Sequence, residues 1–437
     1  MEDYISYIIK FLIGGDNATK LSSMIGYTSH ENVFSRYRIV IIPSNYFDEE
    51  VYGTPASIPQ LPLNEVEGIP LLFGTPEVEW YDDTLVVKAD IVASTYFLIT
   101  RYEEIQRRSE RDIYGRFPGK KSLPYRAGFL HRPIVDEYGR LLRRWLREAR
   151  VNIPDQEPQI KKIWLTHDID VPFFCHSLRS LARESIKGIG FSKAWKIYRE
   201  NISFDPYYTY PWLIEQRNEL KNVLGKERCD SLFFFKAGGL SAQDRPRYNI
   251  HSKRIHNLIK LCEEEHIEIG LHASYDAGRN PSLLAFEKTI LEKTTRRRIY
   301  LNRYHFLDSR EPEDLNILEK TGITDDFSMG YADVAGFRLG TSHPVFWINP
   351  EDKRISGLIL HPLTAMDCTL SDPKYMGMSY EEAQVYCLQL CEQVRQANGE
   401  VVLLWHNDRV AEAPYLSPAD NWQRKLFKSL IEELQKE

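Results

Sequence analysis

Short apolar runs alternate with stretches of helical spacing from Lys161 to the end of the chain. The runs are KKIWLT, SLFFFKA, IEIGL, GLILHPL and VVLLWH. Runs of this length are typical of buried strands, and strands that alternate with helices favour a parallel α/β sheet or barrel. Between two of these runs, apolar residues at helical spacing predict a helix that has Ser252 as its N-cap and extends to about His266.

The first third of the chain has a different pattern. It combines Pro and Gly punctuation with short β-like runs such as RIVIIP and TLVVKADI, and it ends in a helix expected over Tyr138 to Ala149. The segment VNIPDQEPQI, with two prolines, predicts a linker. We therefore expect a smaller N-terminal α+β domain over residues 1–155 and an α/β domain over residues 160–437, with an aromatic-rich insertion at about residues 173–230.

Charge and composition narrow the classes of function. The 437 residues include 56 basic and 62 acidic side chains, a formal net charge of -6 that argues against broad binding of nucleic acid. Six cysteines without a regular CxxC spacing are typical of reduced thiols, so a cytoplasmic location is expected. The N-terminal segment lacks the basic leader of a signal peptide, and no later window approaches the roughly 20 apolar residues of a membrane span. The oligomeric state stays open.

Ionisable or amide side chains follow four of the apolar runs. Because the carboxyl ends of parallel strands form the face where α/β folds bind ligands, four such occurrences predict a functional site at that face. A single histidine at such a place would more often be a packing or capping residue. The residues concerned are Asp168, Asp170, His272, His361, His406 and Asn407.

Two of these patterns suit a metal ion. Asp168 and Asp170 are two residues apart, so they point to the same side of an extended segment, as a metal ligand and a general base would. A turn-forming Asp pair is the structural alternative. His272 and Asp276 are four apart, which on a helical turn puts both on one face, although such pairs also arise as salt bridges or caps. With Asp170 they make a three-ligand set that leaves a position for water.

The order of THDID, HASYD, RYHFL, DDFSMGYAD and LLWHN resembles the polysaccharide deacetylase superfamily, the carbohydrate esterase family 4 fold, over about residues 160–437. The resemblance implies a distorted (β/α) barrel. It also implies that Asp168 is the catalytic base and that Asp170 and His272 bind the metal. The family has a second metal-binding histidine where this chain has Asp276.

The later motifs carry the remaining roles. Arg303 in RYHF would orient Asp168 and lower its pKa, and His305 replaces the proline of the family motif. His406 in LLWHN would be the general acid. We expect substrate contacts from four residues in or beside these motifs: His305, Asp326, Trp405 and Asn407. The N-terminal region, with RYEE and HRPIVDEY, resembles an accessory domain found ahead of divergent bacterial deacetylases.

The resemblance implies a metal-dependent hydrolase that removes an acetyl group from an N- or O-acetylated saccharide or polysaccharide in cell-surface polysaccharide metabolism. The cofactor is expected to be Zn²⁺, with Co²⁺, Ni²⁺ or Mn²⁺ as alternatives. Two other functions stay open: a catalytically inactive saccharide-binding or assembly protein on the same fold, and another C–N hydrolase acting on small amides. Asp367, in the loop after LILHPLTAM, either lines the cleft or caps a turn.

Overall fold

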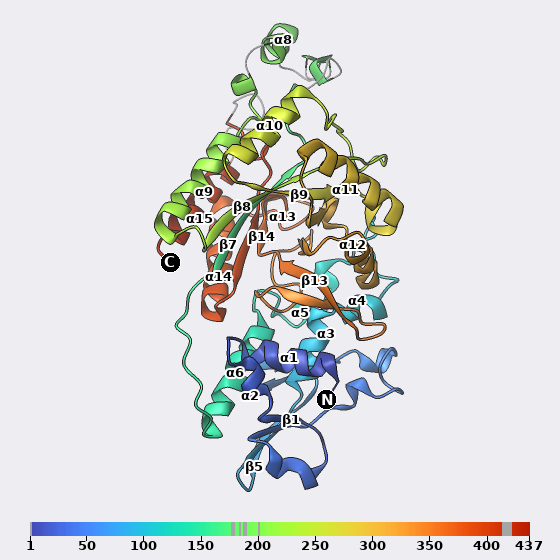
Figure 1. The fold of residues 1–437 in the computed structure, drawn as a ribbon, viewed down its shortest axis with the longest axis vertical. Helices are drawn as coiled ribbons and strands as arrows, with labels where there is room; N and C mark the ends of the chain where they lie inside the picture. Colours follow the sequence, from blue (N-terminus) through green and yellow to red (C-terminus); the bar gives the residue numbers. More distant parts are fainter. Residues whose placement is uncertain (1, 176–179, 183–184, 187–189, 200–201, 413–421) are drawn as a thin grey trace.

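The structure, a computed structural model, describes residues 2–175, 180–182, 185–186, 190–199, 202–412 and 422–437. The larger part, from residue 162 onward, is a mixed α/β body around a curled sheet (Figure 1). The N-terminal residues lie beneath it, and the connecting segment after residue 150 runs along the outside of the molecule (Figure 1).

Nine strands form the main sheet, in the order β12-β13-β11-β10-β9-β8-β7-β15-β14. Strand β12 is antiparallel to its neighbour β13, and the other pairs in this order are parallel. The strands are β7 (Lys162–Ile169), β8 (Cys229–Phe235), β9 (Glu268–Ala273), β10 (Leu301–Tyr304), β11 (Asp325–Met329), β12 (Val345–Ile348), β13 (Ile355–Pro362), β14 (Ala365–Met366) and β15 (Glu400–Leu404).

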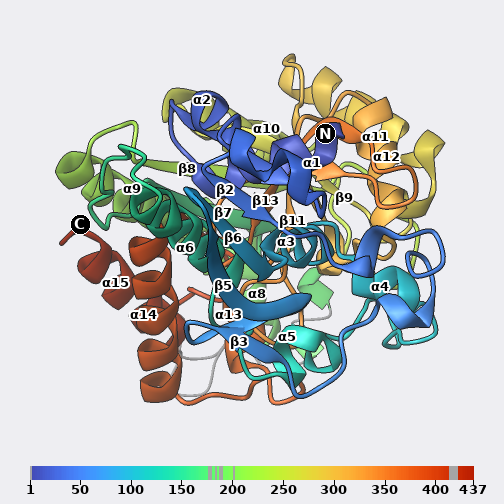
Figure 2. The same cartoon turned by 90° about the horizontal axis from the view of Figure 1, so that it is seen from below.

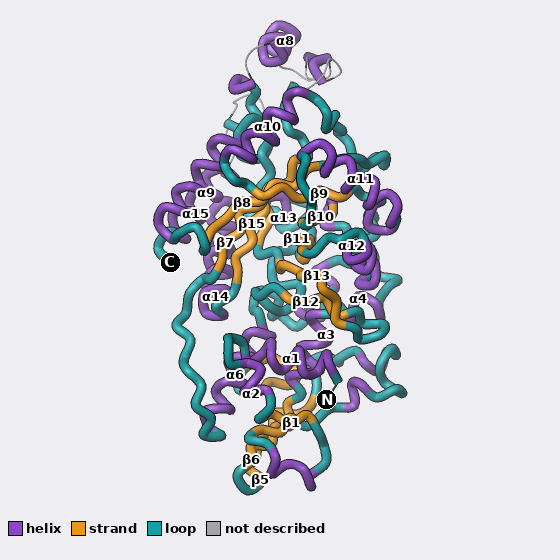
Figure 3. Tube along the Cα trace, in the orientation of Figure 1, coloured by secondary structure: helices purple, strands orange, loops and turns teal. Residues whose placement is uncertain are grey.

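The two ends of this sheet approach each other. The backbone N–H of Thr364, just after β13, donates to the carbonyl of Val402 in β15 at 2.9 Å. The sheet therefore curls into an incomplete barrel, with its helices on the outside (Figure 3). These helices are α8 (Phe191–Arg199), α9 (Tyr210–Leu224), α10 (Lys253–Glu264), α11 (Pro281–Thr295), α12 (Asn316–Lys320), α13 (Asp367–Ser371), α14 (Tyr380–Ala397) and α15 (Trp422–Leu434).

The five apolar runs of the sequence lie in β7, β8, β9, β13 and β15, so the strands predicted from them are confirmed. The predicted helix cap is also present: the Ser252 hydroxyl accepts from the Ile255 N–H at the start of α10. Local pattern and fold agree here because these strands are largely buried between the barrel interior and the helices, although β13 is partly exposed on one face at Ile355, Gly357 and Ile359.

The N-terminal residues build a separate four-stranded sheet in the order β1-β2-β6-β5. Its strands are β1 (Ile25–Tyr27), β2 (Ile39–Ile41), β5 (Gly74–Tyr81) and β6 (Thr84–Ala89), and β3 (Asn64–Val66) pairs with β4 (Ile69–Leu71). The helices are α1 (Asp3–Ile13), α2 (Ala18–Ser22), α3 (Ile91–Ile99), α4 (Tyr102–Gln106), α5 (Leu123–Arg126) and α6 (Ile134–Glu148).

The N-terminal region packs against the end of the barrel near β12 and β13 (Figure 3), and Figure 2 shows this region from below. One apolar cluster runs from Ile8 of α1 through Phe97 of α3 to Trp347 of β12. A buried ion pair spans the same junction, because Glu104 of α4 contacts Arg338 at 2.8 Å. The N-terminal region is thus joined to the barrel through both apolar and charged contacts.

The expected insertion at residues 173–230 is described in part. Residues 176–179, 183–184, 187–189 and 200–201 of it lie outside the described residues, and α9 is its longest described helix. Its residues Phe173 and Tyr210 belong to the main apolar cluster. Within the described ranges, no helix combines the length and apolar character that crossing a membrane requires.

Candidate metal centre and active site

Two carboxylates come from the carboxyl end of β7. Asp168 is in the strand and Asp170 follows its last residue, with Ile169 between them fully buried in the core. Both carboxylates line one cavity, as the alternation of an extended segment requires. The predicted convergence of this pair is therefore present in the structure.

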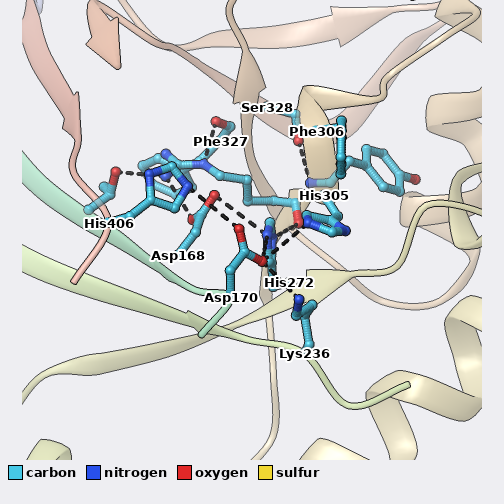
Figure 4. A network of polar contacts seen from close by, with 12 residues as sticks. Asp168, Asp170, Lys236, His272, His305, Phe306, Phe327, Ser328 and His406 are labelled. Atoms are coloured by element: carbon cyan, nitrogen blue, oxygen red, sulfur yellow. Dashed lines mark hydrogen bonds and ion pairs between the residues drawn. The ribbon is translucent and has the colours of Figure 1, made fainter. Parts of the chain in front are cut away.

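Two imidazoles approach Asp170 from strands farther along the sheet, β9 and β10 (Figure 4). His272 is in β9, and its Nε2 atom lies 3.3 Å from Asp170 Oδ1. His305 follows β10, and its Nε2 atom lies 3.2 Å from the same oxygen. One ligand atom from each of the three residues lies within 4.8 Å of the others, so the side chains can share one ion.

The other nitrogen of each imidazole is held by a hydrogen bond. His272 donates from Nδ1 to the carbonyl of Arg303 at 2.9 Å. His305 donates from Nδ1 to Asp244 Oδ1 at 3.0 Å, and Asp244 also accepts from the Tyr275 N–H at 3.0 Å. These bonds place a proton of each imidazole on Nδ1 and aim Nε2 at Asp170, the arrangement found around metal-bound histidines.

The donor set fits a divalent transition metal. His272 Nε2 is buried and makes no hydrogen bond of acceptable geometry. Buried polar atoms without such partners are costly unless another group, such as a cation, satisfies them. Two imidazoles and one carboxylate are ligands that Zn²⁺ and similar ions accept, with further positions left open.

Lys236 adds a positive charge at the same carboxylate. It follows β8, its side chain is 4% exposed, and its Nζ atom lies 3.1 Å from Asp170 Oδ1. Burial on its own raises the pKa of Asp170, but Lys236 and His305 outweigh it and hold that pKa well below its ordinary value. Asp170 is therefore ionised and available as a ligand.

Asp168 is paired with a buried arginine. Arg303 in β10 is fully enclosed, and its Nη1 atom lies 3.2 Å from Asp168 Oδ1. The same nitrogen donates to the Thr166 hydroxyl at 2.7 Å, and Nε donates to the Phe327 carbonyl at 3.0 Å. The guanidinium thus fixes one carboxylate oxygen and leaves Oδ2, 3.6 Å from His272 Nε2, on the cavity side.

His406 lies on the opposite side of Asp170 from His305 (Figure 4). Its Nε2 atom is 3.7 Å from Asp170 Oδ2, and its Nδ1 atom donates to Asp367 Oδ1 at 2.9 Å. The Asp367 carboxylate also accepts the His406 backbone N–H at 2.7 Å. Burial opposes the charge on His406, but Asp367 outweighs it and raises the pKa of His406 well above its ordinary value.

A cavity of about 230 Å³ opens over these groups. Asp168, Asp170, His272, His305 and His406 all line it. Its remaining wall is formed by side chains from the barrel loops and by one residue of the N-terminal region, and includes Phe306, Met366, Cys368, Tyr375, Arg409 and Arg116. A small polar substrate can therefore reach the carboxylates and imidazoles together.

Asp276, expected as the third ligand, does not join the cluster. His272 lies in a strand that ends at Ala273, so residues 272 and 276 do not share a helical face. Asp276 is exposed at the start of a 3-10 turn and its side chain makes no capping bond. His305, which we expected to contact substrate, is the third member of the cluster instead of Asp276.

Three of the four expected substrate contacts lie outside the cavity. Asp326 is fully buried and accepts from Asn302 and Ser328. Trp405 donates from its indole to the Gln423 carbonyl, in the second apolar cluster. Asn407 donates its amide to two backbone carbonyls, those of Val171 and Tyr207. Each is a buried structural residue rather than part of the cavity wall.

His361 also lies apart from the cavity, although it is near the end of β13. It sits between Asp325, at 3.0 Å, and Glu400, at 3.2 Å, which are the first residues of β11 and β15. The inclination of β13 thus brings this histidine toward the amino ends of the other strands. Of the four strand-end patterns, three contribute to the site.

The pattern of the sequence did not single out Asp244, Lys236 or Arg116. Lys236 directly follows the apolar run SLFFF, so the rule that strand ends supply site residues could have found it. Asp244 and Arg116 come from irregular loops, and no periodic signal marks them. For Asp367 the sequence predicts either a cleft-lining or a turn-capping role, and the structure places it beside His406.

One family model matches the N-terminal part of the chain. A family described as a family of unknown function (DUF7033) matches residues 5–150, which is the N-terminal region. A search of curated proteins returned no match.

Solved structures are similar to the chain at low identity. One is described as a polysaccharide deacetylase from Mycobacterium smegmatis, with 16% identity, a TM-score of 0.40, and coverage of 65% of this chain and 86% of that chain. Two more are the PuuE allantoinase, at 13% identity, TM-score 0.38 and coverage of 65% and 89%, and a protein described as a polysaccharide deacetylase from Pseudomonas aeruginosa PAO1. The latter has 13% identity, a TM-score of 0.36 and coverage of 63% and 84%.

Proposed function

We propose that the protein is a metal-dependent hydrolase that removes an acetyl group from an N- or O-acetylated saccharide. The observation that carries the proposal is the convergence of Asp170, His272 and His305 on one side of a cavity that also contains Asp168 and His406. Asp168 and Asp170 come from the carboxyl end of the same strand. Each of the other three residues comes from the end of a different strand or from the loop that follows it. The order of motifs in the sequence supports the same chemistry.

Asp170, His272 and His305 would hold the ion, and Asp244 and the Arg303 carbonyl would orient the two imidazoles. A divalent ion bound there supplies a Lewis acid for the acetyl carbonyl and a water of lowered pKa.

Two further residues transfer protons. Asp168 accepts the proton of the attacking water at Oδ2, because Arg303 occupies Oδ1. His406 donates a proton from Nε2 to the departing amine or alcohol, because Asp367 stabilises the imidazolium through Nδ1. General acid and general base each contribute on the order of 100- to 10,000-fold in rate.

Acetate release tests the proposal. The purified protein, loaded with Zn²⁺ or Co²⁺, should release acetate from at least one member of a panel of N- and O-acetylated oligosaccharides. Hydrolysis of small amides with no acetate release from this panel would favour the other C–N hydrolase instead. Asp168→Asn should abolish turnover and leave the Zn²⁺ affinity within about twofold of the native value. Retained turnover in Asp168→Asn would remove this residue from the role of base.

A metal-free saccharide-binding protein is the second candidate, and Lys236 favours it. The Lys236 ammonium already offers Asp170 a buried counter-charge at 3.1 Å without any ion. A protein purified without stoichiometric metal that still binds oligosaccharides, and releases no acetate when metal is added, would support this candidate over the hydrolase.

A further inference from the structure

The backbone directly after His305 is in an unfavourable conformation. Phe306 has φ of 66° and Leu307 has φ of 53°. Neither residue is glycine, and two consecutive side chains in the left-handed region cost free energy. Such a turn persists only where its surroundings determine it. Because the turn begins at the residue after His305, its shape sets where the His305 imidazole lies.

The N-terminal region supplies the contacts that hold this turn. Arg116 donates from Nη1 to the Phe306 carbonyl at 2.8 Å, and its side chain is only 8% exposed. The ring of Tyr114 lies 5.1 Å from the ring of Phe306, centroid to centroid. The barrel in turn holds the loop, since the Tyr275 hydroxyl donates to the Tyr114 carbonyl at 2.7 Å.

Arg116 is itself oriented by its own loop. Asp112 Oδ2 accepts from Arg116 Nε at 2.8 Å, and Asp112 Oδ1 accepts the backbone N–H groups of Tyr114 and Arg116, each at 2.9 Å. A guanidinium held on one edge by a carboxylate presents its other edge in a fixed direction. The direction here is the Phe306 carbonyl.

A second arginine of the N-terminal region fixes the far end of the same segment. Arg101 is 3% exposed, and its guanidinium donates to the Ser309 hydroxyl at 2.9 Å and to the Ser309 carbonyl at 2.6 Å. The backbone from His305 to Ser309 is thus held at both ends by side chains that lie outside the barrel sequence.

We infer that the N-terminal region is a structural part of the metal centre, and that Arg116 is a positioning residue that holds the left-handed turn at Phe306 and Leu307 and thereby places His305 for metal binding. This inference rests on the metal site of the proposed function. It gives the residues matched by the family of unknown function a role in this chain, namely completing the site of the barrel.

The test measures Zn²⁺ affinity of the full chain by competition with a chromophoric chelator. Arg116→Ala should weaken Zn²⁺ binding by roughly tenfold to a hundredfold, the range typical of residues that orient metal ligands. Arg116→Lys, which keeps one donor for the Phe306 carbonyl, should recover part of that loss. Arg108→Ala is the matched control, because Arg108 also links the N-terminal region to the barrel, through Glu311 and Glu313, without touching the turn.

The outcomes separate the inference from the proposed function. If the native protein binds no Zn²⁺, the metal site fails and the inference fails with it. If the native protein binds Zn²⁺ and Arg116→Ala binds it equally well, or if Arg108→Ala loses as much affinity, only the inference is overturned. If Arg116→Ala does not fold, Asp112→Asn takes its place in the test. A Zn²⁺ affinity of Asp112→Asn below that of Arg108→Ala supports the inference, and an unchanged affinity overturns it.

Discussion

His305 Nε2 lies 3.2 Å from Asp170 Oδ1. This contact joins the end of β10 to the end of β7, across β9 and β8 of the sheet. It makes His305 rather than Asp276 the partner of His272 at the carboxylate. The contact therefore brings together Asp170, His272 and His305, three side chains that can share one metal ion.

The first prediction concerns these three ligands. His305→Ala should weaken Zn²⁺ binding by roughly a hundredfold or more, because a ligand is lost rather than reoriented. Asp276→Ala should leave the affinity unchanged, since this side chain is exposed and makes no contact with the cluster. Chelator competition on both variants measures the difference, and a loss of affinity in Asp276→Ala would restore the ligand set expected from the sequence.

The second prediction concerns Lys236. Its ammonium lies 3.1 Å from Asp170 Oδ1 and repels a cation bound there. Lys236→Met should therefore tighten Zn²⁺ binding by roughly tenfold or more. The control is Lys221→Met, because Lys221 forms an ion pair of similar length, 3.0 Å, but with Asp230 rather than with Asp170. A weaker affinity in Lys236→Met would mean that the ammonium supports the site instead.

The third prediction concerns the pair of His406 and Asp367. Asp367→Asn removes the charge that stabilises the His406 imidazolium, so proton donation to the leaving group becomes harder. We expect kcat for acetate release to fall by roughly a hundredfold or more. Zn²⁺ affinity should stay close to native, because Asp367 is not one of the three ligands. A parallel loss of metal would show that Asp367 acts on the whole site.

The strand-end residues could be predicted because two local rules coincide in them. Asp168 and Asp170 stand at alternate positions at the end of a run of buried residues. The sequence therefore predicts that both side chains point the same way and that both lie at the carboxyl edge of the sheet. The alternation of side chains along an extended segment also explains Trp405. This residue is adjacent to His406 in the chain, so its side chain points the opposite way, into the core.

The rest of the site depends on contacts that no local pattern encodes. We expected His272 and Asp276 to share one face of a helical turn, but β9 extends through His272 and places Asp276 away from it. Asp244 reaches His305 from an irregular loop after β8, and Arg116 reaches it through Phe306 from the N-terminal region. Such pairings are fixed by loop conformation and by the packing of the N-terminal region against the barrel.

The fourth prediction concerns a buried carboxylate at the junction between the N-terminal region and the barrel. Glu104 of α4 contacts Arg101 at 2.5 Å and Arg338 at 2.8 Å, and its side chain is 3% exposed. Burial on its own raises the pKa of Glu104, but the two guanidinium groups outweigh it and lower the pKa from 4.5 to about 2.

A carboxyl group whose pKa is lower in the folded than in the unfolded state contributes stability above the unfolded value and loses it as the pH falls through the folded value. For Glu104 this contribution is complete above about pH 4.5 and disappears toward pH 2, and it amounts to about 3 kcal/mol. Glu104→Gln should therefore lower the free energy of unfolding at pH 7 by about 3 kcal/mol and make its decline between pH 4.5 and 2 shallower.

Urea unfolding at a series of pH values measures both effects. Glu49→Gln, at an exposed carboxylate, should reproduce the native curve. If Glu104→Gln follows the native pH dependence with only a uniform offset, the carboxylate contributes packing rather than charge at this junction. If it unfolds the N-terminal region separately from the barrel, the ion pair with Arg338 is what couples the two.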